Sequence, residues 1–147
     1  MRYTMKHSRT FTTYSPDETF AFAETLGANA QSGDVFALYG DLGTGKTIIA
    51  KGIAKGMGIE EDITSPTFTL LEEYDAKIPL YHFDLYRIED DIEFDQLFFE
   101  EYWENEGVSV IEWAERAGNR LPEQSIQIYI TYLDPDRREI TIEYPDN

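Results

Sequence analysis

The chain has 147 residues, which fits one domain over residues 1–147, and its hydrophobic fraction of 41% is that of a folded protein. It contains no cysteine, which excludes disulfides, thiol nucleophiles and cysteine-based zinc sites. The formal charge of −17 argues against sequence-independent binding to nucleic acid, and it predicts either simple solubility or an acidic face that docks on a basic partner.

The N-terminal segment is typical of a strand followed by a helix. Residues 10–14 are rich in side chains that favour strands. Ser15 then fits an N-cap, Pro16 fits the first helical position, and Glu18 is placed to reach back to free backbone N–H groups, as in a capping box. We expect this helix to run to about residue 30.

A buried strand and a phosphate-binding motif come next. Residues 35–39 form an unbroken apolar run, the pattern of a strand covered on both faces of a sheet. Residues 40–47 then match G-x-x-x-x-G-K-[ST] at every position. Residues 48–55 have the pattern of a helix, and Gly56 and Gly58 mark its end.

The middle of the chain contains a predicted hairpin and a predicted helix. Residues 68–74 and 80–86 are extended segments joined by five residues that include a proline, which favours a hairpin. Residues 93–104 have the pattern of one acidic amphipathic helix.

The C-terminal segments complete the predicted sheet. Residues 108–111 form a second buried strand, and residues 126–133 and 138–144 alternate as the strands of a hairpin do. Parallel and antiparallel patterns together predict an α/β fold: a three-layer domain like those of P-loop NTPases, with a mixed, partly parallel sheet flanked by helices.

The P-loop motif predicts a site for a nucleoside triphosphate. A loop that wraps a phosphate with its backbone N–H groups forms most easily where Cβ atoms are absent, and the following helix directs its positive end at the same phosphate. Lys46 contacts the β- and γ-phosphates in this motif, and the Thr47 hydroxyl binds Mg²⁺. The expected nucleotide-binding residues of the loop are Asp41, Leu42, Gly43, Thr44, Gly45, Lys46 and Thr47.

Carboxylates near the phosphates are needed to hold Mg²⁺ and to order the attacking water. Glu112 directly follows the buried strand 108–111, at the edge where ligands bind in open α/β sheets; a solvated strand end is the alternative. Asp84 is an acid within an apolar and aromatic strand, where unpaired carboxylates seldom occur. It either pairs with Arg87 or another cation, or it faces the metal.

Three more side chains are candidates around the site. Thr67 lies between the P-loop helix and the hairpin, where P-loop proteins often have a switch that senses the γ-phosphate; a plain turn fits equally well. His82 is expected to be a packed aromatic ring rather than a general base. Trp113 is expected in the core, with nucleotide stacking or a partner contact as alternatives.

The class of P-loop protein is narrowed by what the sequence lacks. It has no N/T-K-x-D element and no D-x-x-G after the P-loop, which favours ATP over GTP. Small-molecule kinases typically need lid and acceptor-binding insertions, for which 147 residues leave little space. The residues therefore favour a compact ATPase that acts on a protein partner.

The location in the cell follows by elimination. No stretch approaches the roughly 20 apolar residues that a membrane span needs. Residues 1–9 are slightly basic, but the apolar segment that follows the basic region of a signal peptide is missing after them. We therefore expect a cytoplasmic protein without a membrane contact.

Four linked motifs carry a more specific resemblance. They are residues 40–47, Ser65-Pro66-Thr67-Phe68-Thr69-Leu70, Tyr81-His82-Phe83-Asp84-Leu85-Tyr86-Arg87, and Ile111-Glu112-Trp113-Ala114-Glu115. In order and spacing, over residues 35 to about 122, they resemble the TsaE family, also called YjeE. The flanking elements fit the family as well.

The resemblance implies an ATPase of bacterial tRNA modification that uses ATP and Mg²⁺. The family supports formation of N6-threonylcarbamoyladenosine at position 37 of tRNAs that read codons beginning with A. It implies TsaB and TsaD as partners: TsaD transfers the carbamoyl group, and the TsaE protein binds the TsaB–TsaD pair and hydrolyses ATP to reset the cycle. Contact with tRNA is then indirect, through the complex, which gives the acidic charge a place.

The resemblance also assigns roles to single residues. It implies that Lys46 and Thr47 hold phosphate and Mg²⁺, that Asp84 and Glu112 serve the metal or the water, and that Thr67 belongs to the switch. Trp113 follows the acid, as the family pattern expects.

The expected reaction is in-line attack of water on the γ-phosphate of Mg·ATP. Lys46 and the loop amides stabilise the developing charge, and either Glu112 or Asp84 positions the water. No arginine is clearly placed to act as a finger, so we expect slow turnover by the isolated chain and completion of the site by a partner. The rival interpretations are a small kinase and a nucleotide-dependent switch that binds a partner with incidental hydrolysis.

Overall fold

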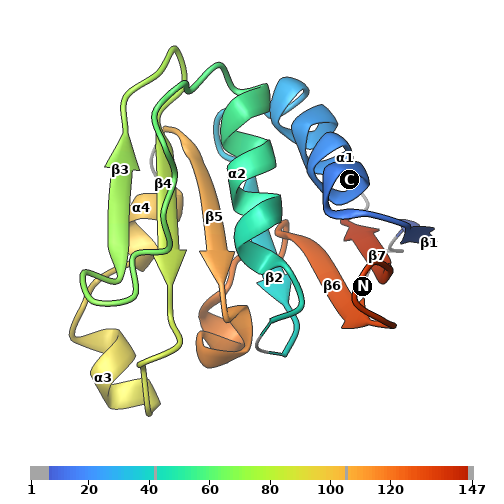
Figure 1. The fold of residues 1–147 in the computed structure, drawn as a ribbon. Coiled ribbons are helices and arrows are strands. Elements are labelled where there is room, and N and C mark those ends of the chain that lie inside the picture. Colours follow the sequence, from blue (N-terminus) through green and yellow to red (C-terminus); the bar gives the residue numbers. More distant parts are fainter. Residues whose placement is uncertain (1–6, 42, 105, 146–147) are drawn as a thin grey trace.

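The computed structural model describes residues 7–41, 43–104 and 106–145. Seven strands form one mixed sheet in the order β1-β7-β6-β2-β5-β4-β3 (Figure 1). The strands are β1 (His7–Thr13), β2 (Val35–Tyr39), β3 (Leu71–Tyr74), β4 (Leu80–Asp84), β5 (Val108–Glu112), β6 (Ile126–Tyr132) and β7 (Arg138–Tyr144). The helices are α1 (Pro16–Ala28), α2 (Lys46–Gly56), α3 (Asp91–Asp95) and α4 (Glu100–Glu104), with 3₁₀ turns at Ala114–Arg116 and Gly118–Arg120.

The middle of the sheet is parallel and its two sides are antiparallel. Strands β6, β2, β5 and β4 pair in parallel, whereas β1–β7, β7–β6 and β4–β3 pair antiparallel. Both predicted hairpins, β3–β4 and β6–β7, are therefore confirmed. The first is shorter than expected because β3 begins at Leu71 and β4 ends at Asp84.

Helices cover both faces of the sheet, which confirms the predicted three-layer α/β fold. The side chains of β2 alternate: Phe36 and Leu38 pack in the cluster that contains α1 and α2 residues. Val35 and Ala37 pack in the opposite cluster, which contains α4 and the 3₁₀ turns. The expectation of a strand buried on both faces is thus confirmed for residues 35–39.

Helix α1 begins with the predicted capping interactions. The Ser15 hydroxyl accepts a hydrogen bond from the Glu18 backbone N–H at 3.1 Å. The Glu18 carboxylate reaches back as expected, but it accepts from the N–H of Tyr14 at 2.9 Å, one residue before the N-cap. The helix ends at Ala28, two residues before the predicted end.

The prediction of one helix over residues 93–104 is wrong. The structure has two short helices, α3 and α4, and between them Phe98 has φ 56° and is 65% exposed. The break brings Phe94, Phe99 and Trp103 together, with ring centroids of Phe94 and Phe99 6.1 Å apart. A continuous helix would turn Phe99 about 140° away from Phe94.

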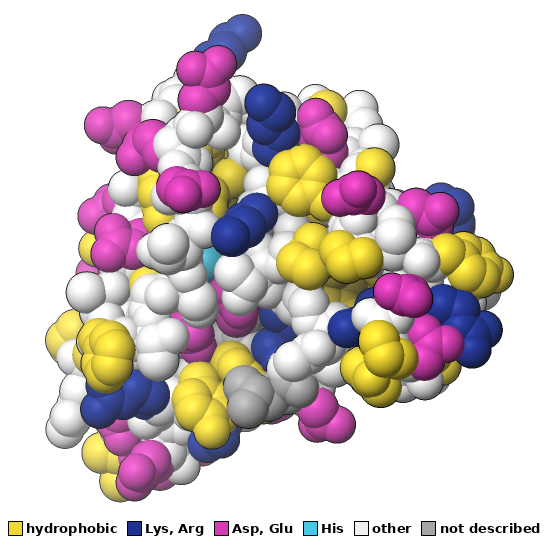
Figure 2. Space-filling view, in the orientation of Figure 1, with side chains coloured by type: hydrophobic (Ala, Val, Ile, Leu, Met, Phe, Trp, Pro, Cys, Tyr) yellow, Lys and Arg dark blue, Asp and Glu magenta, His cyan; other side chains and the backbone are white. Residues whose placement is uncertain are grey.

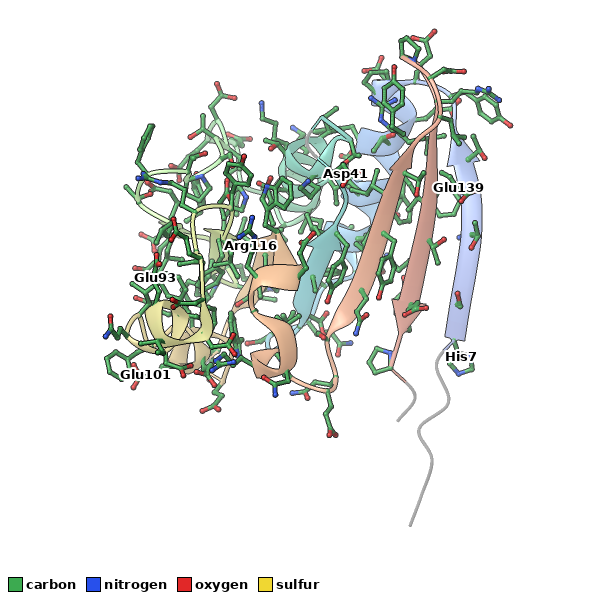
Figure 3. The ribbon with its side chains drawn as sticks, turned by 90° about the horizontal axis from the view of Figure 1, so that it is seen from below. His7, Asp41, Glu93, Glu101, Arg116 and Glu139 are labelled. Carbon is green, nitrogen blue, oxygen red and sulfur yellow. The ribbon has the colours of Figure 1, made fainter. Side chains whose placement is uncertain are left out.

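Acidic side chains are spread along the sheet rather than gathered at one end. The labelled Glu93 and Glu101 lie on the α3–α4 side, and the labelled Glu139 lies at the opposite end, near β1 (Figure 3).

Within the described residues, none of the helices has the length and apolar character that crossing a bilayer requires.

Helices α1 and α2 approach so closely that glycines are needed where they cross. A Cβ on Gly52 of α2 would lie 2.7 Å from the backbone oxygen of Phe20 in α1, and Cβ atoms on Gly27 and Gly56 would also collide with backbone. Because backbone atoms cannot turn aside as a side chain does, these contacts fix how α2 sits on the sheet.

We predict that Gly52→Ala destabilises the fold by about 1–3 kcal/mol, because the cost of overpacking exceeds the gain in helix propensity. Urea unfolding followed by circular dichroism measures this. The matched control is Lys51→Ala on the exposed side of the same helix, which should shift the unfolding free energy by no more than about 0.5 kcal/mol. Equal stability of the two variants would contradict the proposed close approach.

Candidate functional site

The P-loop joins the end of β2 to the start of α2. Gly43 and Gly45 have φ values of 81° and 110°, which glycine adopts readily and other residues resist. A Cβ on Gly40 would lie 2.6 Å from the Thr44 hydroxyl oxygen and 2.9 Å from the backbone oxygen of Ile130. The expectation for Leu42 falls outside the described residues.

Lys46, the first residue of α2, folds back on its own loop. Its Nζ donates to the backbone oxygens of Asp41, at 3.0 Å, and Gly40. Burial lowers the pKa of this ammonium group, and the nearby carboxylates of Glu115 and Glu112 oppose that shift. The cation therefore sits in a confined place where a bound anion would gain from its charge.

Arg138, the first residue of β7, binds the backbone of the P-loop. Its Nε donates to the backbone oxygen of Thr44 at 2.7 Å, and the Thr44 hydroxyl donates to the backbone oxygen of Asp41 at 2.8 Å. Sequence reasoning missed this arginine, because it lies 94 residues after Thr44 and is not part of a recognisable motif.

The two candidate carboxylates lie side by side. β4 and β5 are parallel neighbours, and Asp84 stands opposite Glu112 in their register. Alternation along β5 places Glu112 on the same face as Val110, which packs in the α1–α2 cluster. There the Thr47 hydroxyl donates to Glu112 Oε1 at 3.1 Å, although the two residues are 65 positions apart. Asp84 and Glu112 are only 4% and 3% exposed.

Asp84 bonds to hydroxyls rather than to Arg87. Its Oδ2 accepts from Ser65 Oγ at 2.6 Å and more weakly from Thr67 Oγ1 at 3.4 Å, and its Oδ1 accepts from the Tyr86 N–H at 2.9 Å. The Arg87 guanidinium lies over the Phe68 ring instead, 5.3 Å from its centroid. Among the described ion pairs none involves Asp84, so the alternative of a structural salt bridge is not seen.

His82 has a polar role that sequence reasoning missed. The ring is fully buried, as expected for a packed aromatic, but Nε2 lies 2.6 Å from Glu112 Oε2. The spacing to Asp84 was the available signal, because residues two apart in a strand share a face.

Trp113 lines the site and also packs against the core cluster on the α4 side of the sheet. Its backbone is left-handed, with φ 59°, and its side chain is half-buried. The Lys46 Nζ lies 3.9 Å from the centroid of the indole ring, and Tyr86 packs on it at 4.8 Å.

Most of the predicted site residues share one cavity of about 440 Å³. Figure 2 shows acidic and basic side chains close together in the hollow at the centre of this face. The cavity is lined by Gly43, Gly45, Lys46, Thr47, Ile48, Ser65, Thr67, Asp84, Tyr86, Glu112 and Trp113. Asp41 and Thr44 line a separate cavity of about 330 Å³ beside Tyr39 and Tyr129.

The donor set is suited to a metal that arrives with a nucleotide. Within residues 7–41, 43–104 and 106–145, no three His, Asp or Glu side chains form a cage that would hold a metal alone. One hydroxyl and one or two carboxylates, from Thr47, Glu112 and Asp84, are the kind of set that Mg²⁺ uses together with phosphates and water.

Comparisons with known proteins agree on one family. The family model described as "Threonylcarbamoyl adenosine biosynthesis protein TsaE" matches residues 13–140. Proteins named "tRNA threonylcarbamoyladenosine biosynthesis protein TsaE" are similar to this chain in Bacillus subtilis and Treponema pallidum. The first is 47% identical over 130 residues, which is 88% of this chain and 81% of that protein. The second is 41% identical over 128 residues, or 87% and 95%.

A solved structure extends the similarity to three dimensions. "Crystal structure of Bacillus subtilus YdiB" matches with a TM-score of 0.81 and 39% sequence identity, and it covers 95% of this chain and 87% of that one. The family model and the relatives together span both the P-loop and the strands that carry Asp84 and Glu112. The chain belongs to the TsaE family.

Proposed function

We propose that the chain binds and hydrolyses ATP, and that with TsaB and TsaD it supports formation of N6-threonylcarbamoyladenosine at position 37 of tRNAs that read codons beginning with A. The pathway is the one named in the descriptions of the family and of its relatives. The observation that carries the ATPase assignment is the convergence of Lys46, Thr47, Asp84 and Glu112 on one cavity at the P-loop.

The phosphates would bind between the loop amides and Lys46. The carbonyl oxygens that now accept from Lys46 are weaker partners for an ammonium group than an ionised phosphate. Lys46 would therefore turn from Gly40 and Asp41 to the β- and γ-phosphates. The positive end of α2 faces the same position and adds to the attraction.

Thr47 and Glu112 are the residues that would hold Mg²⁺. Their side chains already lie 3.1 Å apart, so a hydroxyl and a carboxylate oxygen are presented together. Bound there, Mg²⁺ would neutralise charge on the phosphates. Asp84 lies beside Glu112 on the neighbouring strand β4 and is bonded to Ser65 and Thr67, and we assign it to ordering the attacking water.

Three arginines near the site contact backbone oxygens or an aromatic ring. Arg138 donates to the backbone oxygen of Thr44, Arg116 donates to that of Ile88, and Arg87 lies over Phe68. The transition-state charge is consequently stabilised by Lys46 and the loop amides without a finger from these arginines. The lack of a finger from these arginines supports slow ATP turnover by the isolated chain and completion of the site by the partner proteins.

We predict that Lys46→Ala lowers ATP hydrolysis at least about 100-fold, because it removes the cation that stabilises the transferring phosphoryl group. Phosphate release at saturating Mg²⁺ measures this. Lys51→Ala, an exposed lysine of the same helix, should retain the wild-type rate. Wild-type hydrolysis in the Lys46 variant would remove the site assignment.

We also predict that the TsaB–TsaD pair raises the turnover number for phosphate release about tenfold or more, since a completed site stabilises more of the transition-state charge. The assay uses ATP labelled at the γ-phosphate, with and without the pair from the same organism. The label should appear as inorganic phosphate. Transfer of label to an acceptor would identify a kinase, and ATP-dependent association without stimulated release would identify a switch.

A further inference from the structure

His82 is placed to act on Glu112. It lies on β4 two residues before Asp84, and β4 pairs in parallel with β5, so that His82 stands opposite Val110 and Asp84 opposite Glu112. Alternation puts the imidazole on the α2 side of the sheet, next to the Glu112 carboxylate. The ring is 0% exposed, and its Nε2 lies 2.6 Å from Glu112 Oε2.

The surroundings of the ring decide which nitrogen carries the proton. Nδ1 is buried and has no hydrogen-bond partner among the described residues. A proton on Nδ1 would bury an unpaired donor, and it would also leave the bare Nε2 facing a carboxylate oxygen at 2.6 Å, acceptor against acceptor. The proton therefore sits on Nε2, and His82 donates to Glu112.

Glu112 depends on this donor because it has few others. Its Oε1 accepts from Thr47 and its Oε2 from His82. No Lys or Arg in the described part of the chain forms an ion pair with it. A buried carboxylate that is fixed by two hydrogen bonds, one on each oxygen, has a defined plane.

We propose that His82 is a positioning residue for the metal: it holds Glu112 by Oε2, so that Oε1 is presented beside the Thr47 hydroxyl. The proposal rests on the proposed function for the assignment of Glu112 to Mg²⁺. Because the ring lies behind the carboxylate rather than in the cavity lining, its effect passes through Glu112. Mutating the hydrogen-bond partner of a metal-binding side chain typically lowers metal affinity or activity about 10–100-fold.

The test compares two substitutions at one position. His82→Phe keeps the ring and removes the donor, whereas His82→Gln supplies an amide N–H of similar reach. The first readout is binding of a fluorescent, non-hydrolysable ATP analogue in Mg²⁺ and in EDTA. The ratio of the two affinities gives the metal contribution without any turnover. The second readout is kcat for phosphate release.

We expect His82→Phe to reduce the metal contribution about tenfold or more, and to lower kcat, while affinity in EDTA stays within about twofold. His82→Gln should recover most of both losses. Val110→Ala removes packing opposite His82 in the strand register and is the matched control: it should lower Tm without changing the metal contribution. In a Glu112→Gln background, His82→Phe should add nothing further.

Two results at position 82 would overturn the positioning role itself. One is a wild-type metal contribution in His82→Phe, and the other is an equal loss in the Phe and Gln variants, which would mean a purely structural role. If Glu112→Gln reduces the metal contribution and His82→Phe does not, only the positioning role falls. If wild type binds the analogue equally well with and without Mg²⁺, the assignment of Glu112 to the metal falls, and the positioning role with it.

Discussion

The parallel register of β2, β5 and β4 is the constraint on which the site depends. It ends β4 and β5 level, with Asp84 opposite Glu112, and β2 delivers the P-loop on the other side of β5. Alternation then turns both carboxylates toward the helix that begins with Lys46 and Thr47. A shift of one residue in β5 would point Glu112 to the opposite face and separate it from Thr47.

Two carboxylates are buried at the site, and neither forms an ion pair with an arginine of the described residues. Hydroxyls and one imidazole supply the hydrogen bonds instead, from Ser65 and Thr67 to Asp84 and from Thr47 and His82 to Glu112. Such partners satisfy the hydrogen-bonding capacity of a carboxylate without forming an ion pair with an arginine. Two acidic side chains arranged in this way suit the proposed binding of a divalent cation, and the buried Lys46 suits the proposed binding of phosphate.

How much the sequence could predict differs from feature to feature. The strands and the P-loop follow from local patterns, and Glu112 was found because it directly follows a buried strand. The prediction of one helix over residues 93–104 is wrong because the local spacing of apolar residues cannot show that Phe94 and Phe99 both face the sheet. The contacts of His82 and Arg138 escaped notice because they depend on strand register and on residues far apart in the chain.

In the proposed site, Thr47 and Glu112 hold Mg²⁺ while Asp84 orders the water. A crystal structure of the chain with Mg²⁺ and a non-hydrolysable ATP analogue tests this arrangement most directly. We expect the metal about 2.1 Å from Thr47 Oγ1, with Glu112 as a direct or water-mediated ligand and with Lys46 on the phosphates. A metal remote from both side chains, with the hydrogen bond between Thr47 and Glu112 intact, would contradict it.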